Sequence, residues 1–526
     1  MDCEKVSISR RALVGGTVAL AAGTLSGAAP KSSVAYADEA GAVVWDDEYD
    51  VIVVGAGLAG LTAATTVAIE GNGATCLLLE KGETCGGNSP YAAGSVLYCT
   101  DAEAFKVYLD AMIGDSTPED VKKAFCEGLL ENLDFLKQLG AKDEWLTVGA
   151  PDDEKLGEWP ELPNDNTYGR IKFNSESDGP ATVYTFMDGI VQEHDDVITY
   201  MAKTPLESLV QDPVSKEILG VVANGKYYRA KCGVIMCTGG FESNGEMLYT
   251  YTHVKGVKPY AGRLNTGDGH KVCMRVGADF WHMAGGAQYW LACRDLANER
   301  FVSTVWNFTT KQYGITVGVN GRRFYMDYDA CSCPTDPYAE ADSDMRLNVG
   351  YRHGATQFGG QWTHLPLPEK AWFVFDAQAL ANGAFPAEVS GDPVADGWAL
   401  VADTLEDLAD QMDVPAEELA RTVQVWNQSC ENGFDAAFYR PVDTLTPIAT
   451  APFYAMLCAP AMLNTDGGPV RSARGEILDV DGKPIAHLYS AGEFGSVWGH
   501  LYQGTGNLGE CMAFGRISAR NALKNA

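Results

Sequence analysis

Positive charge and long apolar segments are both scarce in this sequence of 526 residues. Its 39 Lys and Arg residues face 70 Asp and Glu residues, which leaves a formal net charge of −31. Such a charge repels nucleic acids and anionic membrane surfaces, so neither is expected as a partner. No series of long apolar runs indicates a multi-span membrane protein, and no collagen or coiled-coil repeat is present. Hydrophobic residues still make up 46% of the chain, enough for a large core, which excludes intrinsic disorder.

The 14 cysteines lack the spacings of metal or haem sites. No C-x-x-C, C-x-x-C-H or ferredoxin-type run occurs, so haem, iron–sulfur clusters and metal ions have no sequence signature. Cys76 and Cys237 fall in apolar, strand-like runs and are expected to be buried thiols. Cys331 and Cys333 form a close pair, which we interpret as part of a loop rather than as a redox or metal site.

The first 37 residues have the pattern of a targeting segment. Arg10 and Arg11 precede a weakly apolar, Gly-rich stretch from Ala12 to Ala29, and Ala35-Tyr36-Ala37 has the small-x-small form of a cleavage site. The segment resembles a twin-arginine signal peptide, which predicts export across the cytoplasmic membrane to the cell envelope. A retained membrane anchor is the alternative, and the glycines and threonines of the stretch make it a poor membrane span.

A nucleotide-binding signature follows the targeting segment. Tyr49–Val54 is an apolar, β-branched run typical of a buried parallel strand, and Leu61–Ala64 is helix-like. The turn between them reads Gly55-Ala56-Gly57-Leu58-Ala59-Gly60. In this G-x-G-x-x-G pattern the first Gly allows a tight turn, the second lets the backbone approach a pyrophosphate, and the third lets helix and strand pack closely. The helix N-terminus attracts the phosphate charge, so the pattern predicts a dinucleotide site.

A second apolar run, Thr75–Leu79, ends in Glu80 and is followed by Lys81. A carboxylate at this strand end can accept hydrogen bonds from ribose hydroxyls, which favours a ribose without a phosphate group. Further Gly-rich turns follow along the chain. They are Gly86–Ser89, Ala93–Ser95, Thr238–Phe241, Thr266–His270, Leu488–Glu493, Gly504–Gly509 and Phe514–Arg516.

In the order and spacing of these motifs, from Tyr49 to Arg516, the chain resembles the fumarate reductase/succinate dehydrogenase flavoprotein family, which includes urocanate reductases and ketosteroid dehydrogenases. The resemblance implies a tightly bound FAD. It also implies that the helix after Gly506 points its N-terminus at the flavin and stabilises negative charge on the reduced ring. The FAD contacts that it implies are Gly55, Ala56, Gly57, Ala59, Gly60, Glu80, Lys81, Asn88, Ser89, Gly94, Ser95, Leu206, Thr238, Gly239, Asp268, Glu493, Asn507 and Leu508.

The FAD motifs lie toward both ends of the chain, so the domain that holds them is expected to be discontinuous. We predict an α/β fold in which a Rossmann-like FAD-binding domain carries an inserted α+β substrate or cap domain. The leader would span residues 1–37, the FAD-binding domain residues 38–271 and 450–526, and the cap domain residues 272–449. Within the cap, the pattern of Asp403–Trp426 predicts amphipathic helix broken near Pro415.

Three positions depart from the fumarate reductases that the chain resembles. Those enzymes clamp two carboxylates with His and Arg and use an Arg as the proton donor, whereas alignment of the motifs places Asn464, Tyr502 and Cys331 at these positions. All three departures remove positive charge, so a dicarboxylate would find no cationic clamp and fumarate is not expected as the substrate.

The element Tyr502-Gln503-Gly504-Thr505-Gly506 instead resembles the Tyr-x-Gly-x-Gly element of ketosteroid dehydrogenases. Carried over, the Tyr502 hydroxyl and the Gly506 amide would bind a ketone oxygen and stabilise an enolate. Ketosteroid dehydrogenases also use a Tyr for proton transfer in the segment after Arg323-Phe324, where this sequence has Cys331 at the corresponding count, so Tyr328, three residues earlier, is the candidate for this role. Tyr91, Tyr98, Tyr289 and His500 are further candidate pocket residues.

The favoured function is reduction of an activated C=C bond, in a neutral enone or steroid-like molecule, by hydride transfer from flavin N5. Reduction is preferred because the chain carries an export signal and no carrier domain of its own, so a separate donor, for example a membrane-anchored cytochrome, would supply electrons. One alternative is an enoate reductase for an aromatic monocarboxylate (cinnamate- or urocanate-like), with Arg294 or Arg346 as the carboxylate ligand. The others are a ketosteroid dehydrogenase working oxidatively and a flavin electron-transfer protein without a small substrate.

Overall fold

The computed structural model places its described residues in one compact unit that begins at Val34. Tyr328, Cys331, Arg346 and His500 lie outside the described residues, as does the leader as far as Val34. The described residues are 35–36, 43–92, 94–151, 159, 162–253, 255–259, 262–286, 289–297, 299, 313–324, 370–382, 389, 392–440, 442–499 and 501–525.

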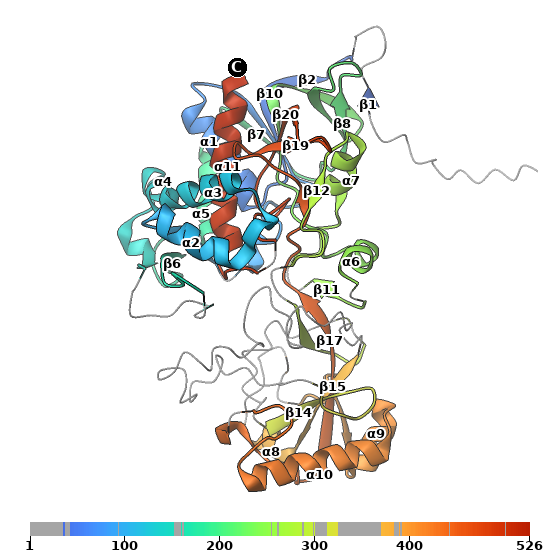
Figure 1. Cartoon of the computed structure of the whole chain (residues 1–526). Helices are drawn as coiled ribbons and strands as arrows, with labels where there is room; N and C mark the ends of the chain where they lie inside the picture. The colour runs from blue at the N-terminus through green and yellow to red at the C-terminus, as the bar shows by residue number, and fades with distance from the viewer. Residues whose placement is uncertain are drawn as a thin grey trace, which may run out of the picture. The chain divides into compact units, whose positions relative to one another are not determined.

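A nine-stranded sheet takes its strands from both ends of the chain, as a discontinuous nucleotide-binding domain requires (Figure 1). The path β1-β8-β9-β10-β2-β3-β7 forms the sheet, with β20 added beside β10 and β19 beside β20. The strands are β1 (Ala35–Tyr36), β2 (Asp47–Val54), β3 (Cys76–Leu79), β7 (Ile198–Met201), β8 (Leu206–Gln211), β9 (Ile218–Ala223), β10 (Lys226–Met236), β19 (Glu476–Leu478) and β20 (Pro484–Ser490).

The parallel strands β2, β3, β10 and β20 end level with one another. Strand pairing aligns Val54 with Leu79 and with Met236, and Met236 with Ser490. The residues that follow these four strand ends therefore meet at one edge of the sheet, although hundreds of residues separate β3 from β20 in the sequence. In open parallel sheets this edge is where ligands bind.

Both faces of the central strands are buried, which explains why their sequences are apolar without alternation. Val51 and Val53 of β2 face one hydrophobic cluster, whereas Ile52 and Val54 face another. On the first face, α1 (Leu58–Glu70) packs against α11 (Gly506–Ala522), and Figure 1 shows α11 in red beside α1. On the second face lies α7 (Asp268–Arg275).

Smaller elements complete this part of the molecule. One three-stranded sheet has the order β4-β6-β5, and β12 pairs with β18. These elements are β4 (Ser95–Cys99), β5 (Leu146–Gly149), β6 (Tyr168–Phe173), β12 (Phe280–Trp281), β18 (Gly468–Pro469), α2 (Ala102–Ile113), α3 (Glu119–Leu130), α4 (Asn132–Gln138), α5 (Val183–Glu193) and α6 (Gly245–Thr252).

A six-stranded sheet is built around the long strand β17. Two amphipathic helices, α9 (Leu405–Met412) and α10 (Ala416–Asn432), bury their apolar side chains against this sheet, and Pro415 caps α10 at the predicted break. The other elements are β11 (Lys258–Pro259), β13 (Tyr289–Arg294), β14 (Gly314–Gly318), β15 (Ala371–Asp376), β16 (Ala399–Ala402), β17 (Phe453–Met462) and α8 (Ala377–Ala381).

Strand pairing divides the two sheets at positions other than residues 272 and 449. β11 and β17 pair within the six-stranded sheet, although both lie outside the predicted cap range. Val272, Val276 and Phe280 pack instead against the nine-stranded sheet. Strand pairing and side-chain packing decide which sheet each segment joins, and the sequence has no change of composition at these boundaries. Among the residues that the structure describes, no helix has the length and apolar character needed to cross a bilayer.

Candidate functional site

A cavity opens at the edge where the parallel strands end. It encloses about 840 Å³ of space not filled by protein, part of which is continuous with solvent. Leu79 and Glu80 at the end of β3, Cys237 after β10 and Ala491 after β20 all contribute to its wall. Strand register is therefore the reason that these distant segments form one site.

The N-terminus of α1 faces this cavity, as the G-x-G-x-x-G pattern predicts. Gly57, Leu58 and Ala59 line the wall, and Gly57 is the N-cap without any side-chain cap. Gly55 has a φ of 99°, a backbone conformation that residues with a side chain rarely adopt. An added Cβ at this position would also lie 2.3 Å from the Cys237 carbonyl oxygen. This tight crossing of chains brings the positive end of the α1 dipole to the cavity.

Gly60 permits the close packing of α1 on the turn. A Cβ at residue 60 would lie 1.8 Å from the Gly55 carbonyl oxygen. We expect Gly60→Ala to push α1 away from the turn, to destabilise the protein by at least about 1–3 kcal/mol, and to lower its FAD content. Thermal denaturation and the flavin absorbance of the purified protein measure both effects.

Gly189→Ala on α5 is the matched control for this prediction, because nothing lies within 4 Å of a Cβ at that position. This substitution should leave the melting temperature unchanged or raise it, since Ala is favoured over Gly within helices. Equal melting temperatures and FAD contents for Gly60→Ala and Gly189→Ala would contradict the packing role of Gly60.

Glu80 holds the turn in place from the end of β3. One carboxylate oxygen accepts the Ala56 N–H at 2.9 Å, and the other accepts the Gly82 N–H at 2.7 Å. The side chain is buried and lines the cavity, in the position where the resemblance implies a ribose. Contact with the ribose stays a prediction, whereas the bonds to Ala56 and Gly82 show a structural function that the sequence pattern did not suggest.

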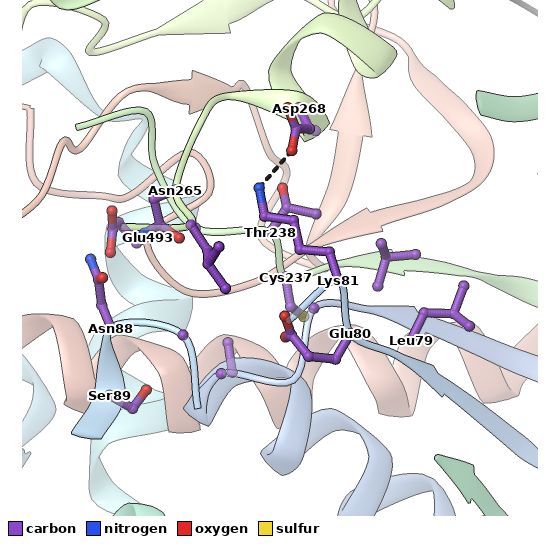
Figure 2. A pocket seen from close by; sticks show the side chains of 18 of the residues that line it. Leu79, Glu80, Lys81, Asn88, Ser89, Cys237, Thr238, Asn265, Asp268 and Glu493 are labelled. Atoms are coloured by element: carbon purple, nitrogen blue, oxygen red, sulfur yellow. Dashed lines mark hydrogen bonds and ion pairs between the residues drawn. The ribbon is translucent and has the colours of Figure 1, made fainter. Parts of the chain in front are cut away.

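Lys81 and Asp268, both predicted as separate cofactor contacts, pair with each other. Lys81 Nζ lies 2.6 Å from Asp268 Oδ2 and also donates to Thr266 Oγ1 at 2.8 Å (Figure 2). Burial raises the pKa of Asp268, but the hydrogen bond and charge of Lys81 outweigh burial and leave that pKa below its usual value. The pair joins β3 to the first turn of α7 at the cavity wall.

Polar side chains gather on another side of the cavity. Figure 2 shows Asn88, Asn265 and Glu493 together there, apart from the Lys81–Asp268 pair. The amide nitrogens of Asn88 and Asn265 donate to Glu242 Oε1 at 2.6 and 2.7 Å. Ser89, next to Asn88, accepts the Leu58 N–H at 2.9 Å and so joins this side to α1.

One buried polar atom at this cavity, Thr238 Oγ1, has no hydrogen-bond partner among the described residues. Buried polar groups are normally paired, so an unpaired one in a cavity wall fits a ligand with hydroxyl or other polar groups. The helix N-terminus suits a diphosphate. The residues present therefore fit FAD.

Twelve of the eighteen predicted cofactor residues line the cavity. Ala56 and Gly60 lie behind its wall, and Gly94, Ser95, Asn507 and Leu508 are not part of the wall that the described residues form. Those in the wall are Gly55, Gly57, Ala59, Glu80, Lys81, Asn88, Ser89, Leu206, Thr238, Gly239, Asp268 and Glu493.

Sequence reasoning missed several wall residues, among them Thr204, Leu264, Asn265 and Cys511. Two of them stand just before predicted contacts: Thr204 precedes the predicted FAD contact Leu206, and Asn265 precedes the motif that contains Asp268. Cys511 lies on α11 one turn beyond the predicted flavin contacts, so helical periodicity could have suggested it. Cys76 and Cys237 are buried as predicted, and Cys237 also lines the cavity.

The first turn of α11 differs from the predicted donor arrangement. The Gly506 N–H donates to the Gln503 carbonyl oxygen at 2.9 Å, and the Asn507 N–H donates to the Tyr502 hydroxyl at 3.0 Å. Gly506 therefore closes a turn in this structure, and the amide that meets Tyr502 is the next one along the helix. Tyr502 is buried and packs edge-on against Trp498.

Asn464 extends this set of uncharged groups. Its side-chain oxygen accepts the Asn507 amide at 2.7 Å, and its amide nitrogen donates to Asp466 at 3.2 Å. Burial is the main cause of the strongly raised pKa of Asp466, and the charge of Glu510 adds to it, so the neutral form of this carboxyl group is favoured. Tyr502, Asn507, Asn464 and Asp466 thus form a connected polar network without a cationic group.

The remaining candidates lie in different surroundings. Tyr98 is buried, Tyr91 is exposed, and Arg294 is fully buried and donates to the Pro460 carbonyl oxygen at 3.1 Å. Tyr289 begins β13, whose pairing with β17 is described, but the Tyr289 side chain lies outside the described residues. Tyr328 and His500 also lie outside them, so their roles stay predictions.

Known proteins are similar to this chain over most of its length. A model of the FAD binding domain family matches residues 50–508. A 3-oxosteroid 1-dehydrogenase of Mycolicibacterium smegmatis is 27% identical, with 91% of this chain and 98% of the relative covered. A vinyl phenol reductase of Lactiplantibacillus plantarum is 25% identical, with 91% and 96% covered. Fumarate and urocanate reductases also match over at least 90% of the chain.

A solved structure shows the same fold. The 3-ketosteroid Δ1-dehydrogenase of Sterolibacterium denitrificans superposes with a TM-score of 0.69 at 22% identity, covering 91% of this chain and all of that one. This likeness confirms the predicted fold class, and the family match confirms the predicted cofactor. The chain belongs to the FAD binding domain family, with ketosteroid dehydrogenases and fumarate and urocanate reductases among its relatives, and it is an FAD-dependent oxidoreductase.

Proposed function

We propose that this flavoenzyme acts on C=C bonds as a reductase, and that its substrate is a neutral conjugated molecule such as an enone of steroid-like size. The observation that carries the proposal is that the polar network at the first turn of α11 contains no cationic group. When bound, FAD supplies hydride transfer between its ring and a carbon of the substrate. The residues of the chain bind and orient the substrate and polarise its activating group.

The network suits a ketone better than a carboxylate. Tyr502 and the two asparagines are hydrogen-bonding groups without charge, and the raised pKa of Asp466 behind Asn464 favours its neutral form. A buried carboxylate needs cationic partners to offset the loss of its hydration, and this network holds none. The names of two relatives point the same way, because a 3-oxosteroid and a vinyl phenol are both uncharged substrates.

Tyr502 is the proposed catalytic donor. Its hydroxyl lies at the N-terminus of α11, where the helix dipole stabilises negative charge. The Asn507 amide donates to the same oxygen, which strengthens the hydroxyl as a donor through hydrogen-bond cooperativity. Charge that develops on a substrate oxygen bonded to Tyr502 would therefore be stabilised.

The runner-up is a reductase for an aromatic monocarboxylate, with Arg294 as its carboxylate ligand. Burial lowers the pKa of Arg294 to about 10, so the guanidinium is still charged at neutral pH. Its bond to the Pro460 carbonyl holds it at the β13–β17 pairing. This position favours a structural role, and the monocarboxylate remains the second candidate. The relatives that bear a dehydrogenase name keep the oxidative direction open to the same site.

A substrate screen under anaerobic conditions tests the proposal. Purified, FAD-loaded protein is mixed with reduced viologen and a panel of steroid enones, simple enones, vinyl phenols, cinnamates, urocanate and fumarate. We expect turnover of the neutral compounds at least about tenfold above that of the carboxylates, in line with the cost of burying an unpaired charge. Turnover of fumarate or urocanate alone would overturn the proposed substrate class.

We also propose that the protein works outside the cytoplasmic membrane and receives electrons from a separate protein, for example a membrane-anchored cytochrome. The paired Arg10 and Arg11 before a Gly-rich apolar stretch support export. The export route for folded, cofactor-loaded proteins suits an enzyme whose FAD-binding sheet joins both ends of the chain.

A further inference from the structure

Glu242 is a buried carboxyl group directly behind the cavity wall, and no sequence motif singled it out. It is 1% exposed and follows the Gly-rich turn after β10. Its Oε1 accepts both asparagine amides of the wall, from Asn88 at 2.6 Å and from Asn265 at 2.7 Å. Its Oε2 accepts the Thr465 hydroxyl at 3.4 Å. Glu242 therefore connects three separate segments of the FAD site.

A second carboxyl group, Glu493, meets Glu242 over the backbone of Gly240. A Cβ on Gly240 would lie 2.4 Å from Glu493 Oε1, 2.6 Å from Glu242 Oε2 and 2.1 Å from Thr465 Oγ1. Three side-chain oxygens thus converge on one point, and only glycine leaves room for them. Glu493 lines the cavity, whereas Glu242 lies behind it.

Both carboxyl groups resist ionisation. Burial raises the pKa of Glu242, and burial together with the charges of Glu242 and Asp466 raises the pKa of Glu493 well above its usual value. Two carboxylates this close, shielded from water, do not both ionise readily. One proton between them, with Glu493 in hydrogen-bonding reach of Glu242, is the arrangement that the geometry favours.

Two basic residues of the surrounding segments are engaged with other partners. Lys81 pairs with Asp268 at 2.6 Å, and Arg471 contacts Glu510 at 3.4 Å. Burial lowers the pKa of His270 to about 4, so this ring is neutral, and it bonds the Gly467 carbonyl. Asp466 is a further titratable neighbour, and as a buried carboxyl group it offers the pair no positive charge, since any charge on it raises the pKa of Glu493 further. A proton is thus the charge partner left to the pair among the described residues.

We infer that Glu242 is a positioning residue of the FAD site, which acts through one proton that it shares with Glu493. The shared proton joins the two carboxyl groups and keeps Asn88, Asn265 and Glu493 in the wall that faces the cofactor. FAD brings a negatively charged diphosphate and excludes water from Glu493, so it binds the form that holds the proton. The inference rests on FAD binding and not on the proposed substrate.

The expected consequence is a pH-dependent affinity for FAD. Because FAD prefers the protonated pair, the dissociation constant rises as pH increases through the titration of the pair, by at most about tenfold per pH unit for one proton. At lower pH, where the pair already holds its proton, the dissociation constant no longer depends on this group. Binding of FAD to wild-type protein at high pH is accordingly accompanied by proton uptake.

Glu242→Gln tests the shared proton. Its amide oxygen can accept from Asn88 and Asn265, and its amide nitrogen can donate to Glu493, so it reproduces the protonated carboxyl group at every pH. We expect wild-type affinity at low pH and no rise of the dissociation constant at high pH. Glu242→Ala leaves both asparagine amides without their acceptor, and we expect FAD binding at least about tenfold weaker across the pH range.

The measurement is FAD titration of flavin-depleted protein, followed by quenching of flavin fluorescence over a series of pH values. Glu83→Gln is the control, because it removes a carboxylate that is 82% exposed and pairs with Lys203 on the surface. It should keep the wild-type pH dependence. Calorimetry of wild-type protein in buffers of different ionisation enthalpy counts the protons taken up without any substitution.

Two results would overturn the inference. One is a Glu242→Gln protein whose FAD affinity depends on pH as strongly as that of wild type. The other is FAD binding to wild type without proton uptake at any pH in the alkaline range. Circular dichroism of each flavin-depleted variant distinguishes these results from a failure to fold, and the calorimetric result stands even if a variant fails to fold.

Discussion

Replacing Tyr502 with phenylalanine is expected to lower kcat on the best neutral substrate by about 10²–10³-fold, while FAD stays bound. The substitution removes the hydroxyl group that meets the first turn of α11 and keeps the ring that packs against Trp498. Anaerobic turnover with reduced viologen measures kcat, and the flavin absorbance of the purified protein measures FAD content.

The size of this effect follows from the position of the hydroxyl. Negative charge develops on the carbonyl oxygen of the substrate as hydride reaches the β-carbon, and a donor at a helix N-terminus stabilises that charge more than it stabilises the neutral ketone. Loss of the donor should therefore lower kcat more than it raises KM. FAD should remain because Tyr502 is not part of the cavity wall that the described residues form.

Tyr489→Phe provides the matched control, because Tyr489, at the end of β20, contacts the C-terminal end of α11 through its hydroxyl group. The Tyr489 hydroxyl bonds the Asn521 carbonyl oxygen at 3.4 Å and accepts the Asn525 amide at 2.9 Å. Its loss should cost about 1 kcal/mol of stability and leave kcat unchanged. An unchanged kcat for Tyr502→Phe would remove Tyr502 from the mechanism.

Arg471→Met is expected to lower the free energy of unfolding by about 3–5 kcal/mol. The guanidinium of Arg471 is fully buried and donates to the carbonyl oxygens of Gly492, Phe494 and Gly495. It also contacts Glu510 and lies over the Phe514 ring. Urea denaturation of the FAD-loaded protein measures the loss.

The physical reason is that methionine fills the space and satisfies none of these polar groups. Three backbone carbonyls lose their donor, and Glu510 loses its only cationic contact among the described residues. The carbonyls belong to the turn that carries Glu493, so FAD content should fall as well. Arg474→Met is the control, because this exposed residue pairs with Glu476 at the surface, where an ion pair contributes about 0–1 kcal/mol.

The loss should also depend on pH. Burial raises the pKa of Glu510 to about 6 even though Arg471 opposes that shift, so removing Arg471 raises this pKa further. A carboxyl group with a raised pKa in the folded state favours folding at low pH, and this contribution is lost as pH rises through the folded-state value. The deficit of Arg471→Met should therefore be smallest in acid and largest above about pH 6. A deficit below about 1 kcal/mol at neutral pH would contradict the assigned role.

The fold could be predicted well where local sequence dictates local structure. The β-branched run Tyr49–Val54, the following glycines and the acidic Glu80 specify strand, turn and strand end over a few dozen residues, and the structure confirms them. The break at Pro415 is confirmed for the same reason, because proline excludes helix before it. The membership of β11 and β17 in the six-stranded sheet was not predictable from the sequence, because it depends on pairing between strands that lie far apart in the chain.

The candidate site divides in the same way. Residues within recognisable motifs, such as Asn88, Thr238 and Glu493, lie in the cavity wall. Asn265 and Glu242 were missed because their importance comes from each other and from Asn88, which lies more than 150 residues away from Glu242. The pairing of Lys81 with Asp268 was missed likewise, although each was named separately.

By itself the sequence predicted the class of fold and a dinucleotide-binding turn, because glycine spacing and apolar runs act on adjacent residues through steric contact and backbone hydrogen bonding. The resemblance of its motifs to the flavoprotein family predicted FAD as the cofactor. Only the tertiary structure decided which charges exist in the site. Burial beside Glu242 favours a protonated Glu493, Lys81 keeps Asp268 ionised, and the Asn507 amide rather than that of Gly506 meets Tyr502. Ionisation and donor direction depend on distances of a few ångström between segments remote in the chain, and such distances exist only after folding.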